Sequence, residues 1–505
     1  MAESTPKLSD LTPAQRAALV RQLTERRAAP TGIPRRPLDV PARLSMLQEQ
    51  LWLVDQLDES QAAAYNVPAA IHMDGPLDVP TLRRSLAEIV RRHESLRSVV
   101  EVRDDVPYQV VRAPQEMAFE VEDRAGVSET ALLAELVADG SRHIDLAAGP
   151  VIRFRLFRLA PDRHLLFLTA HHAFFDGWSL EVVLSELTDV YRAFRSGAVP
   201  PLSDTPVQYA DFAVWQRDRL RGDVLERHLR YWENQLRGMT VLNLPTDRPR
   251  PPVPSSRGDS YECQLDAETS AKARTLAATH AATPYMVVMT AFAMMLARHT
   301  GQEDVVVGTS NAGRDRTDLE NVVGLLTNMN VMRFDLGGDP SFAELLGRIK
   351  QVTIGAKEHG EVGFDKVIER MRMPRDLSRT PLFQVAMDMM PASPARDVDG
   401  LRLRYGNLGL GTSRFDIAIN AFDEPDGFRL WIEYATDLFD RSTIERMFDH
   451  FARILATGVT DPTQTLSGVP MLSASELDQV LREWQGVTRP YPRELIHVQV
   501  AAQAA

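Results

Sequence analysis

The clearest structural pattern in the sequence lies between residues 151 and 190. Residues 151–159 alternate apolar and charged side chains, a period of two that predicts a half-buried strand. A turn at 161–163 leads into a second, mostly apolar strand at 164–171. Ser179 is a good N-cap residue, and apolar residues recur at helical spacing after it, which predicts a helix. This part of the chain is therefore expected to mix strands and helices.

The same alternation of strands and helices is found in both halves of the chain. It favours a fold of the α+β class with two lobes, although no internal repeat is strong enough to establish a duplication. The expected elements are strands at 68–73, 260–265 and 304–307, helices at 79–93 and 283–298, and a strand followed by a helix at 428–455.

Proline-rich stretches predict where the chain divides. A helix expected at 13–27, with Thr12 as its N-cap, precedes a first linker at 29–37, and a second linker lies at 244–254. At about 100–200 residues per domain, the length also favours two to four units. We predict an N-terminal segment at 1–40, a first lobe at 41–220, a second lobe at 221–480 and a tail at 481–505.

The composition excludes several classes of partner and site. The chain of 505 residues has a net charge of −12, which argues against nucleic acid as its main partner. A single cysteine, Cys263, excludes an intramolecular disulfide and a cysteine-based zinc site, and it suits a cytoplasmic protein. The N-terminus has no signal peptide, and the longest apolar run, 285–297, is too short to span a bilayer. We therefore expect no membrane association and interpret this run as a buried helix.

The strongest candidate for chemistry is the sequence in which His171 and His172 are followed by Asp176 and Gly177. Successive strand residues point to opposite faces, so one histidine can face a cleft while the other packs inside the lobe. A histidine with a near-neutral pKa suits general base catalysis. Asp176 can anchor the loop by pairing with a buried arginine, and Gly177 allows a close approach that a side chain would block.

The motif also has a structural, a metal-binding and a hydrolase interpretation. A pair of histidines at a strand end is often two polar residues with satisfied hydrogen bonds, and spacing alone puts catalysis at about even odds. A metal site is disfavoured because no third ligand stands at a suitable spacing. A serine hydrolase is disfavoured because the sequence has no Gly-x-Ser-x-Gly motif.

The motif resembles the His-His-x-x-x-Asp-Gly signature of the condensation domains of nonribosomal peptide synthetases, within the chloramphenicol acetyltransferase-like superfamily. Further segments resemble other blocks of that family and follow in the family's order. Departures from the usual residues, such as Leu326, Thr327, Gly363 and Thr380, affect the expected substrates and not the reaction class. The matching segments are 45–52, 92–97, 209–216, 308–314, 324–328 and 375–382.

The resemblance implies two chloramphenicol acetyltransferase-like lobes in a V-shaped pseudo-dimer with a tunnel between them. It implies peptide bond formation between a donor thioester and the amine of an acceptor aminoacyl thioester. Both would be carried on phosphopantetheine arms of upstream donor and downstream acceptor carrier domains. No metal and no intrinsic cofactor are expected, since Pro340 stands where a carrier domain's modified serine would be. By the same resemblance, residues 1–40 include a linker from an upstream carrier domain, and 481–505 resemble the start of an adjoining adenylation domain.

The resemblance also assigns roles to the central motif. His172 is expected to face the tunnel and contact the acceptor amine, either as a general base or by orienting it. His171 is expected to be a packing residue with a hydrogen-bonded ring. Gly177 is expected to line the channel of the acceptor arm.

Five residues are expected to support this motif. Asp176 is interpreted as structural, because a buried carboxylate without a cation would be costly. Arg314 is its candidate partner; the alternative is a solvated loop arginine. Trp178 and Ser179 are expected to support the same loop. Asn328 could hold the roof of the tunnel or bind an arm, and a turn-capping role is equally open.

Three alternatives to a peptide-forming enzyme remain. The first is a catalytically silent docking module of the same fold, which typically lacks the second histidine or the glycine. The second is a stand-alone acyltransferase. An epimerase and a cyclising relative, the third group, are disfavoured because their own signature residues are absent. We expect a monomer.

Overall fold

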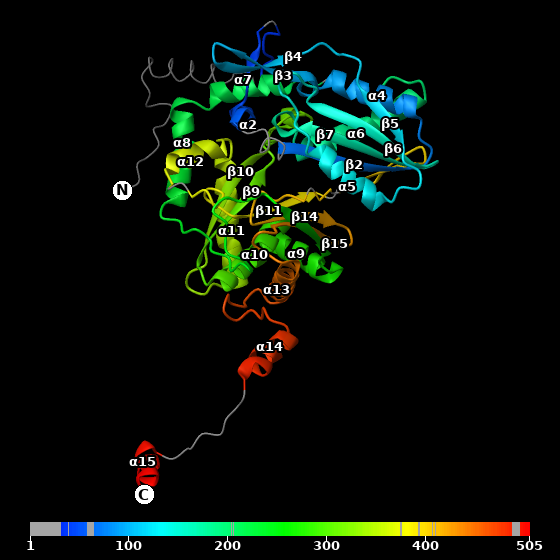
Figure 1. Ribbon diagram of the computed structural model, residues 1–505. Coiled ribbons are helices and arrows are strands. Elements are labelled where there is room, and N and C mark those ends of the chain that lie inside the picture. Colours follow the sequence, from blue (N-terminus) through cyan, green and yellow to red (C-terminus); the bar gives the residue numbers. More distant parts are fainter. Residues whose placement is uncertain are drawn as a thin grey trace, which may run out of the picture.

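The protein, represented by a computed structural model, consists of two lobes that lie one above the other in Figure 1. Most of the upper lobe comes from the first half of the chain, and most of the lower lobe from the second half. Helix α15 (Ile496–Ala504) stands apart from both. The structure describes residues 32–38, 40–57, 65–203, 205, 207–373, 376–391, 394–406, 408–409, 411–486 and 495–505.

The first lobe is built on a six-stranded sheet with the strand order β12-β13-β2-β7-β6-β5. Apolar side chains on one face pack against α4 and α6, and those on the other face pack against α5. Only β5 runs parallel to its neighbour, β6. The elements are β2 (Asn66–Asp74), α4 (Val79–Arg92), β5 (Phe119–Asp123), α5 (Glu129–Gly140), β6 (Ile152–Ala160), β7 (Arg163–His171), α6 (Gly177–Arg195), β12 (Arg396–Val398) and β13 (Leu401–Gly406).

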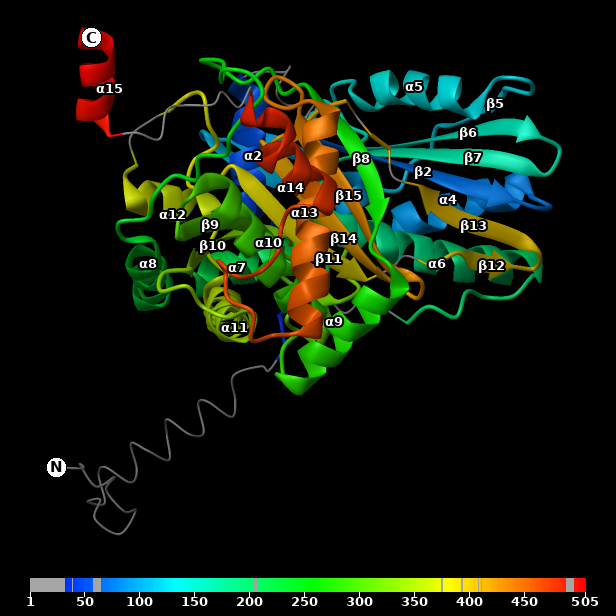
Figure 2. The ribbon, with the colours of Figure 1, turned by 90° about the horizontal axis from the view of Figure 1, so that it is seen from below.

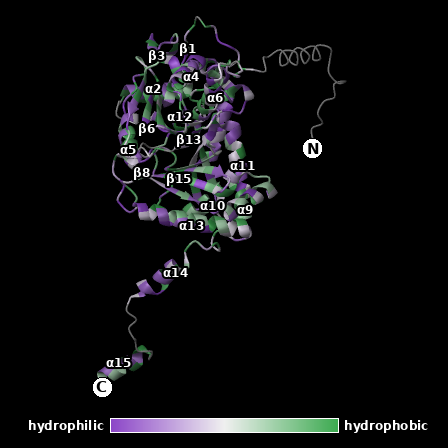
Figure 3. Ribbon diagram, turned by 90° about the vertical axis from the view of Figure 1, so that its right-hand side faces the viewer, coloured by the Kyte–Doolittle hydropathy of each residue, from purple (hydrophilic) through white to green (hydrophobic). Residues whose placement is uncertain are grey.

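The second lobe is built on another six-stranded sheet, with the order β10-β9-β11-β14-β15-β8. Strand β11 is parallel to both of its neighbours, and the other pairs are antiparallel. Figure 2 shows α13 lying across this sheet, and the mixed colours of α9 and α13 in Figure 3 fit helices with one face on the core. The elements are β8 (Gly258–Gln264), α9 (Ala267–Thr279), α10 (Pro284–Thr300), β9 (Asp304–Asn311), β10 (Asn328–Asp335), α11 (Phe342–His359), β11 (Val385–Pro391), β14 (Ile417–Glu424), β15 (Gly427–Ala435), α13 (Arg441–Thr460) and α14 (Ala474–Leu481).

The junction of the lobes contains a small three-stranded sheet and several short elements. A buried cluster there joins Leu44 and Phe174 to Tyr209 and Leu326, which come from both halves of the chain. The Tyr209 hydroxyl donates to the carbonyl of Leu325 at 2.9 Å. The elements are β1 (Ala42–Arg43), α2 (Met46–Leu57), η3 (Glu94–Arg97), β3 (Ser98–Arg103), β4 (Val106–Val111), η4 (His172–Phe174), α7 (Tyr209–Arg219) and η5 (Thr317–Leu319). Helices α8 (Gly222–Leu236) and α12 (Phe364–Met371) pack on the core of the second lobe, and η6 (Glu483–Gln485) lies next to α14.

Most of the expected elements are confirmed. The two strands at 151–171 are β6 and β7, and the apolar run at 285–297 lies in α10, where it is almost wholly buried. The predicted start of α6 is wrong. Asp176, not Ser179, is the N-cap, because its carboxylate accepts hydrogen bonds from both the backbone amide and the hydroxyl of Ser179.

The sheets do not follow a division of the chain at residue 220. Strands β12 and β13 belong to the second half of the sequence, yet β13 pairs with β2 and extends the first sheet. Part of the expected linker at 29–37 also packs on the body, since the Ile33 amide donates to Asp318 and Arg36 pairs with Asp211. The expected helix at 13–27 lies outside the described residues.

Among the described residues, no single helix is long and apolar enough to cross a membrane. Helices α9 and α10 together have the length and apolar composition of a membrane span, but they meet at a bend of 110°.

Candidate active site

The two histidines of the motif lie where β7 ends and the short helix η4 begins. Strand β7 is buried along almost its whole length, and the chain then turns within five residues into α6. The turn carries His172 and Asp176 away from the sheet toward the second lobe. The local sequence therefore places both side chains at the junction of the lobes.

His171 is fully buried, with 0% of its surface exposed. Its Nδ1 accepts a hydrogen bond from the amide of Ala173 at 3.1 Å, so the ring proton is on Nε2. Burial lowers the pKa of His171 to about 3, and the positive charge of Arg414 and neighbouring histidines acts in the same direction. Because the ring is neutral and enclosed, His171 is a packing residue in this structure.

His172 is only half-buried. Its Nδ1 lies 2.8 Å from the carbonyl oxygen of Phe175, and since a carbonyl can only accept, Nδ1 carries the proton. Burial lowers the pKa of His172, and the charge of Arg414 lowers it further. A neutral ring with a protonated Nδ1 leaves the lone pair on Nε2, which has no hydrogen-bond partner among the described residues. Nε2 can therefore accept a proton or a hydrogen bond from a ligand.

Asp176 is completely buried and accepts hydrogen bonds from both lobes. Arg314 donates through two nitrogens, at 2.9 and 3.0 Å. Burial opposes the charged form, but Arg314 and the donors of Ser179 outweigh it, so the pKa of Asp176 lies below its ordinary value. The backbone amides of Leu326 and Thr327 also donate, each at 3.1 Å. With its oxygens engaged in this way, Asp176 holds the loop in place and is not a proton acceptor for a ligand.

The residues around Asp176 tie α6 to the loop that follows β9. Arg314 also donates to the carbonyls of Ala312 and Val322, so its guanidinium is held on several sides. The Ser179 hydroxyl contacts the carbonyl oxygen of Gly324 at 3.1 Å. The Trp178 indole donates to the carbonyl of Glu320 at 2.9 Å. All the supporting residues expected around the motif, except Asn328, thus lie in one network.

Gly177 is exposed and opens α6. A β-carbon at this position would meet only Met390 Cε, at 3.8 Å, which is an ordinary contact. A larger side chain would extend into the space beside the end of β11. The space next to Gly177 is therefore open, and a larger side chain would occupy it.

Asn328 is buried, and its amide is engaged on both sides. Nδ2 donates to the carbonyls of Gly360 and Val362, and Oδ1 accepts from the amide of Phe364. These bonds hold the connection between α11 and α12. They fit the turn-capping interpretation, and they leave no free group with which Asn328 could bind an arm.

Two further polar groups near the lobe junction were not found by sequence reasoning. Arg414 lowers the pKa of both motif histidines through its charge, and its guanidinium lies 4.7 Å from the ring centre of Tyr65. Asp388 on β11 accepts from the amide and the hydroxyl of Ser310, at 2.5 and 2.6 Å, and burial raises its pKa. No local pattern marks Arg414, which lies in an irregular segment, whereas Asp388 is the one charged residue of an otherwise apolar strand, a signal that could have pointed to it.

The described residues contain no group of three or more His, Cys, Asp or Glu side chains that could hold a metal ion.

Comparison with known proteins adds evidence of a different kind. The family model of the condensation domain matches residues 41–481. One of the linear gramicidin synthase proteins of Brevibacillus parabrevis is 37% identical over 475 residues, which cover 92% of this chain and 6% of that protein. Surfactin synthase subunit 1 of Bacillus subtilis (strain 168) is 32% identical, over 92% of this chain and 13% of that protein. The chain thus spans a small part of the length of the relatives it matches.

Solved structures show the same fold. The X-domain from teicoplanin biosynthesis matches with a TM-score of 0.76 and 27% identity, over 87% of this chain and 100% of that one. The first condensation domain of the CDA synthetase matches with a TM-score of 0.75 over 86% of this chain and 100% of that one. Its identity of 23% supports the fold alone.

Proposed function

Because this chain belongs to the condensation domain family of nonribosomal peptide synthetases, we propose that it joins a donor acyl or peptidyl thioester to the amine of an acceptor aminoacyl thioester. Amide bond formation is the reaction of that family. The amine nitrogen bonds to the thioester carbonyl carbon, the carbon–sulfur bond breaks, and the donor thiol leaves. The amine gives up a proton, and the product stays on the acceptor. Residues 1–40 and 481–505 would connect this unit to neighbouring carrier and adenylation domains.

The observation that carries the proposal is the state of His172. Its Nδ1 is occupied by the carbonyl of Phe175, and its pKa is lowered by burial, so a neutral Nε2 is available to a substrate. The reference pKa of an α-amine is about 8, so a useful fraction of the acceptor is already neutral at working pH. His172 can then orient the amine for attack and accept its proton afterwards.

The remaining motif residues position the imidazole and the substrate. Asp176 and Arg314 lock the loop that carries His172 to the second lobe, so the reacting groups meet a fixed imidazole. Gly177 leaves room beside the end of β11 for a phosphopantetheine arm supplied by a carrier domain. That arm delivers its substrate as a thioester, which is already activated for attack.

The test is a condensation assay on loaded carrier proteins. One carrier bears an aminoacyl donor and a second bears an aminoacyl acceptor, and intact-protein mass spectrometry follows the acceptor. We expect its mass to rise by one donor residue with the wild-type chain and to stay unchanged with Gly177→Leu. His280→Ala, which changes an exposed histidine of the second lobe, is the matched control for His172→Ala and should retain activity.

Each outcome separates two interpretations. Loss of product with His172→Ala supports a direct role for the imidazole in the reaction, whereas retained product reduces that role to positioning. Absence of product over a panel of loaded pairs, with carrier binding preserved, would favour a docking module and overturn the enzyme assignment.

A further inference from the structure

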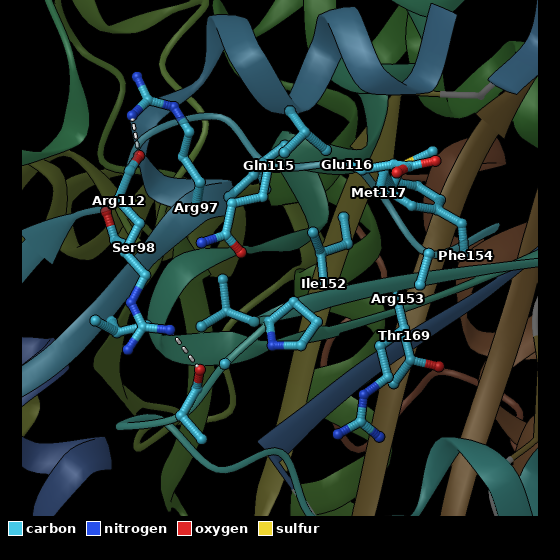
Figure 4. A pocket seen from close by; sticks show the side chains of 18 of the residues that line it. Arg97, Ser98, Arg112, Gln115, Glu116, Met117, Ile152, Arg153, Phe154 and Thr169 are labelled. Carbon is cyan, nitrogen blue, oxygen red and sulfur yellow. Dashed lines mark hydrogen bonds between the residues drawn. The ribbon is translucent and has the colours of Figure 1, made fainter. Parts of the chain in front are cut away.

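A large cavity lies in the first lobe, and its lining does not include any residue of the histidine motif. It has a volume of about 570 Å³, which falls within the range of roughly 300–1,000 Å³ typical of ligand pockets. Its walls are the segment at 96–99, the segment at 112–118 and the outer edge of β6. Figure 4 shows Gln115 reaching over the cavity, opposite Ile152 and Arg153.

The edge of β6 that faces this cavity is not covered by its neighbouring strand. Strand β7 pairs with β6 from Ile152 onward, whereas β5 begins to pair only at Phe154. The carbonyl of Val151 accepts from the amide of His171, so Val151 turns its backbone groups toward β7. The next residue, Ile152, turns its amide and carbonyl to the opposite side, into the cavity. Neither group has a backbone partner on that side among the described residues.

Three arginines of the wall have no carboxylate hydrogen-bonded to their guanidinium groups among the described residues. Arg97, Arg112 and Arg153 donate only to backbone carbonyls, and none of them has an ion pair with a described residue. Asp139, an acid of the wall, is already engaged by Arg155 at 2.7 Å and by Arg142 at 3.0 Å. A guanidinium bound to neutral carbonyls keeps its full charge, so this side of the cavity attracts an anion.

Two further acids of the wall, Glu116 and Glu120, form no ion pair with these three arginines among the described residues. Glu116 stands beside Met117 in Figure 4, with its carboxylate pointing away from Gln115 and Arg112. Glu120 follows on β5 and is largely exposed, at 71% of its side chain. Arg112 and Arg153 therefore make two opposite walls of the cavity basic. Apolar contacts are available between these walls, from Val99, Met117 and Ile152.

We propose that this cavity binds an extended segment of a partner protein that carries a carboxylate. The segment adds as a short strand to the free edge of β6, where its backbone pairs with the amide and carbonyl of Ile152. Its carboxylate pairs with Arg153, the neighbour of Ile152 on β6, and its alternate side chains contact Val99 and Met117. A small free anion would use the arginines but leave the backbone groups of Ile152 unpaired, which is why a peptide is the better occupant.

The test measures the binding of fluorescein-labelled Ac-Val-Asp-Val-Thr-NH2 to the full chain by fluorescence polarisation. Three competitors are compared with the unlabelled peptide: the Asn form of the peptide, a form with methylated backbone nitrogens, and sodium acetate. We expect both altered peptides to bind at least about tenfold more weakly, since one removes the charge and the other removes strand pairing. Acetate should compete only at concentrations far above those of the peptide.

Protein variants locate the site. Arg153→Gln should weaken binding at least about tenfold, as expected for one charge-assisted hydrogen bond, and Arg112→Gln on the opposite wall should weaken it less, because Arg112 acts on the carboxylate only through its charge. Arg158→Gln, an exposed arginine farther along the same strand, is the matched control and should bind like the wild type. Thermal unfolding of each variant shows that the fold is retained. No binding at millimolar peptide, equal binding of the Asn form, or competition by acetate at the peptide's own concentration would overturn the proposal.

Discussion

Replacing Arg314 by methionine should destabilise the protein strongly, because the change leaves the carboxylate of Asp176 buried without its cation. The two side chains are 1% and 0% exposed, and the guanidinium donates to both carboxylate oxygens. Removing one partner of such a buried pair costs about 3–5 kcal/mol. The backbone and hydroxyl donors of Ser179 and Thr327 remain in the variant, so we expect the lower half of that range.

The effect of Arg314→Met should shrink as the pH falls. In the wild type the pKa of Asp176 lies below its ordinary value of 3.8, so its contribution to stability is complete above that value and is lost only in stronger acid. Without Arg314 the burial that opposes the charged form is no longer outweighed, and the pKa of Asp176 rises. Protonation then relieves the unpaired charge, and the difference in stability between variant and wild type narrows from pH 8 toward pH 5.

Urea unfolding at several pH values measures both effects. Arg192→Met is the matched control, because Arg192 pairs with Asp189 on the surface, where the side chains are 48% and 40% exposed. Such a pair is worth about 0–1 kcal/mol, and its loss should vary little over this pH range. A loss below about 1 kcal/mol for Arg314→Met, or a loss that does not change with pH, would refute the argument that this pair is an essential buried tie.

Three further predictions concern residues outside that pair. His171 is held neutral with a pKa of about 3, so the unfolded chain takes up a proton near pH 6.5 that the folded one does not, and stability should fall from there toward pH 3. His171→Asn keeps an acceptor for the Ala173 amide but does not titrate, so it should flatten the dependence of the urea midpoint on pH. An unchanged dependence would show that His171 is not its cause. Asn328→Ala leaves two buried carbonyls and one partly buried amide without their partner and should cost about 1–3 kcal/mol in the same assay, whereas a neutral effect would show that water satisfies those groups. Burial raises the pKa of Cys263 to about 12, so iodoacetamide at pH 8 should label it slowly in the folded protein and quickly in urea, and equal rates would disprove its protection.

The local pattern of the sequence was sufficient for elements that are defined by their own periodicity. Strands β6 and β7 and helix α10 were predicted within a few residues, because their apolar side chains repeat at the spacing of the element. The pairing of β13 with β2 was not predicted, although it sets Arg402 opposite Asp74 and completes the first sheet. Two segments more than 300 residues apart contain no local signal that identifies them as partners, so the lobe boundary at 220 reflected chain order and not sheet membership.

The candidate site likewise combines features that the sequence predicted with features that it did not. That Asp176 needs a buried cation could be argued from desolvation cost, and the resemblance to a known motif pointed to Arg314, which does donate to it. The N-cap was misassigned because Asp176 and Ser179 are both good capping residues, and only the fold shows which carboxylate or hydroxyl receives the first amides. Arg414 influences both histidines from an irregular segment, which no periodic pattern could connect to them.

The position of His172 depends on contacts from both halves of the chain, and this has a consequence for any attempt to divide the protein. The loop that carries His172 is tied through Asp176 to Arg314, and the strand before it is paired with β2, which in turn pairs with β13. Residues 41–220 alone would lose Arg314 and would expose the edge of β2 that β13 covers, so two separate causes would destabilise the isolated segment. We therefore expect this segment to unfold or aggregate when it is produced alone, and co-production with residues 221–486 to restore a soluble complex, as measured by size-exclusion chromatography. A stable, monomeric 41–220 fragment with a native-like circular dichroism spectrum would show that the first lobe holds the histidine loop without help from the second.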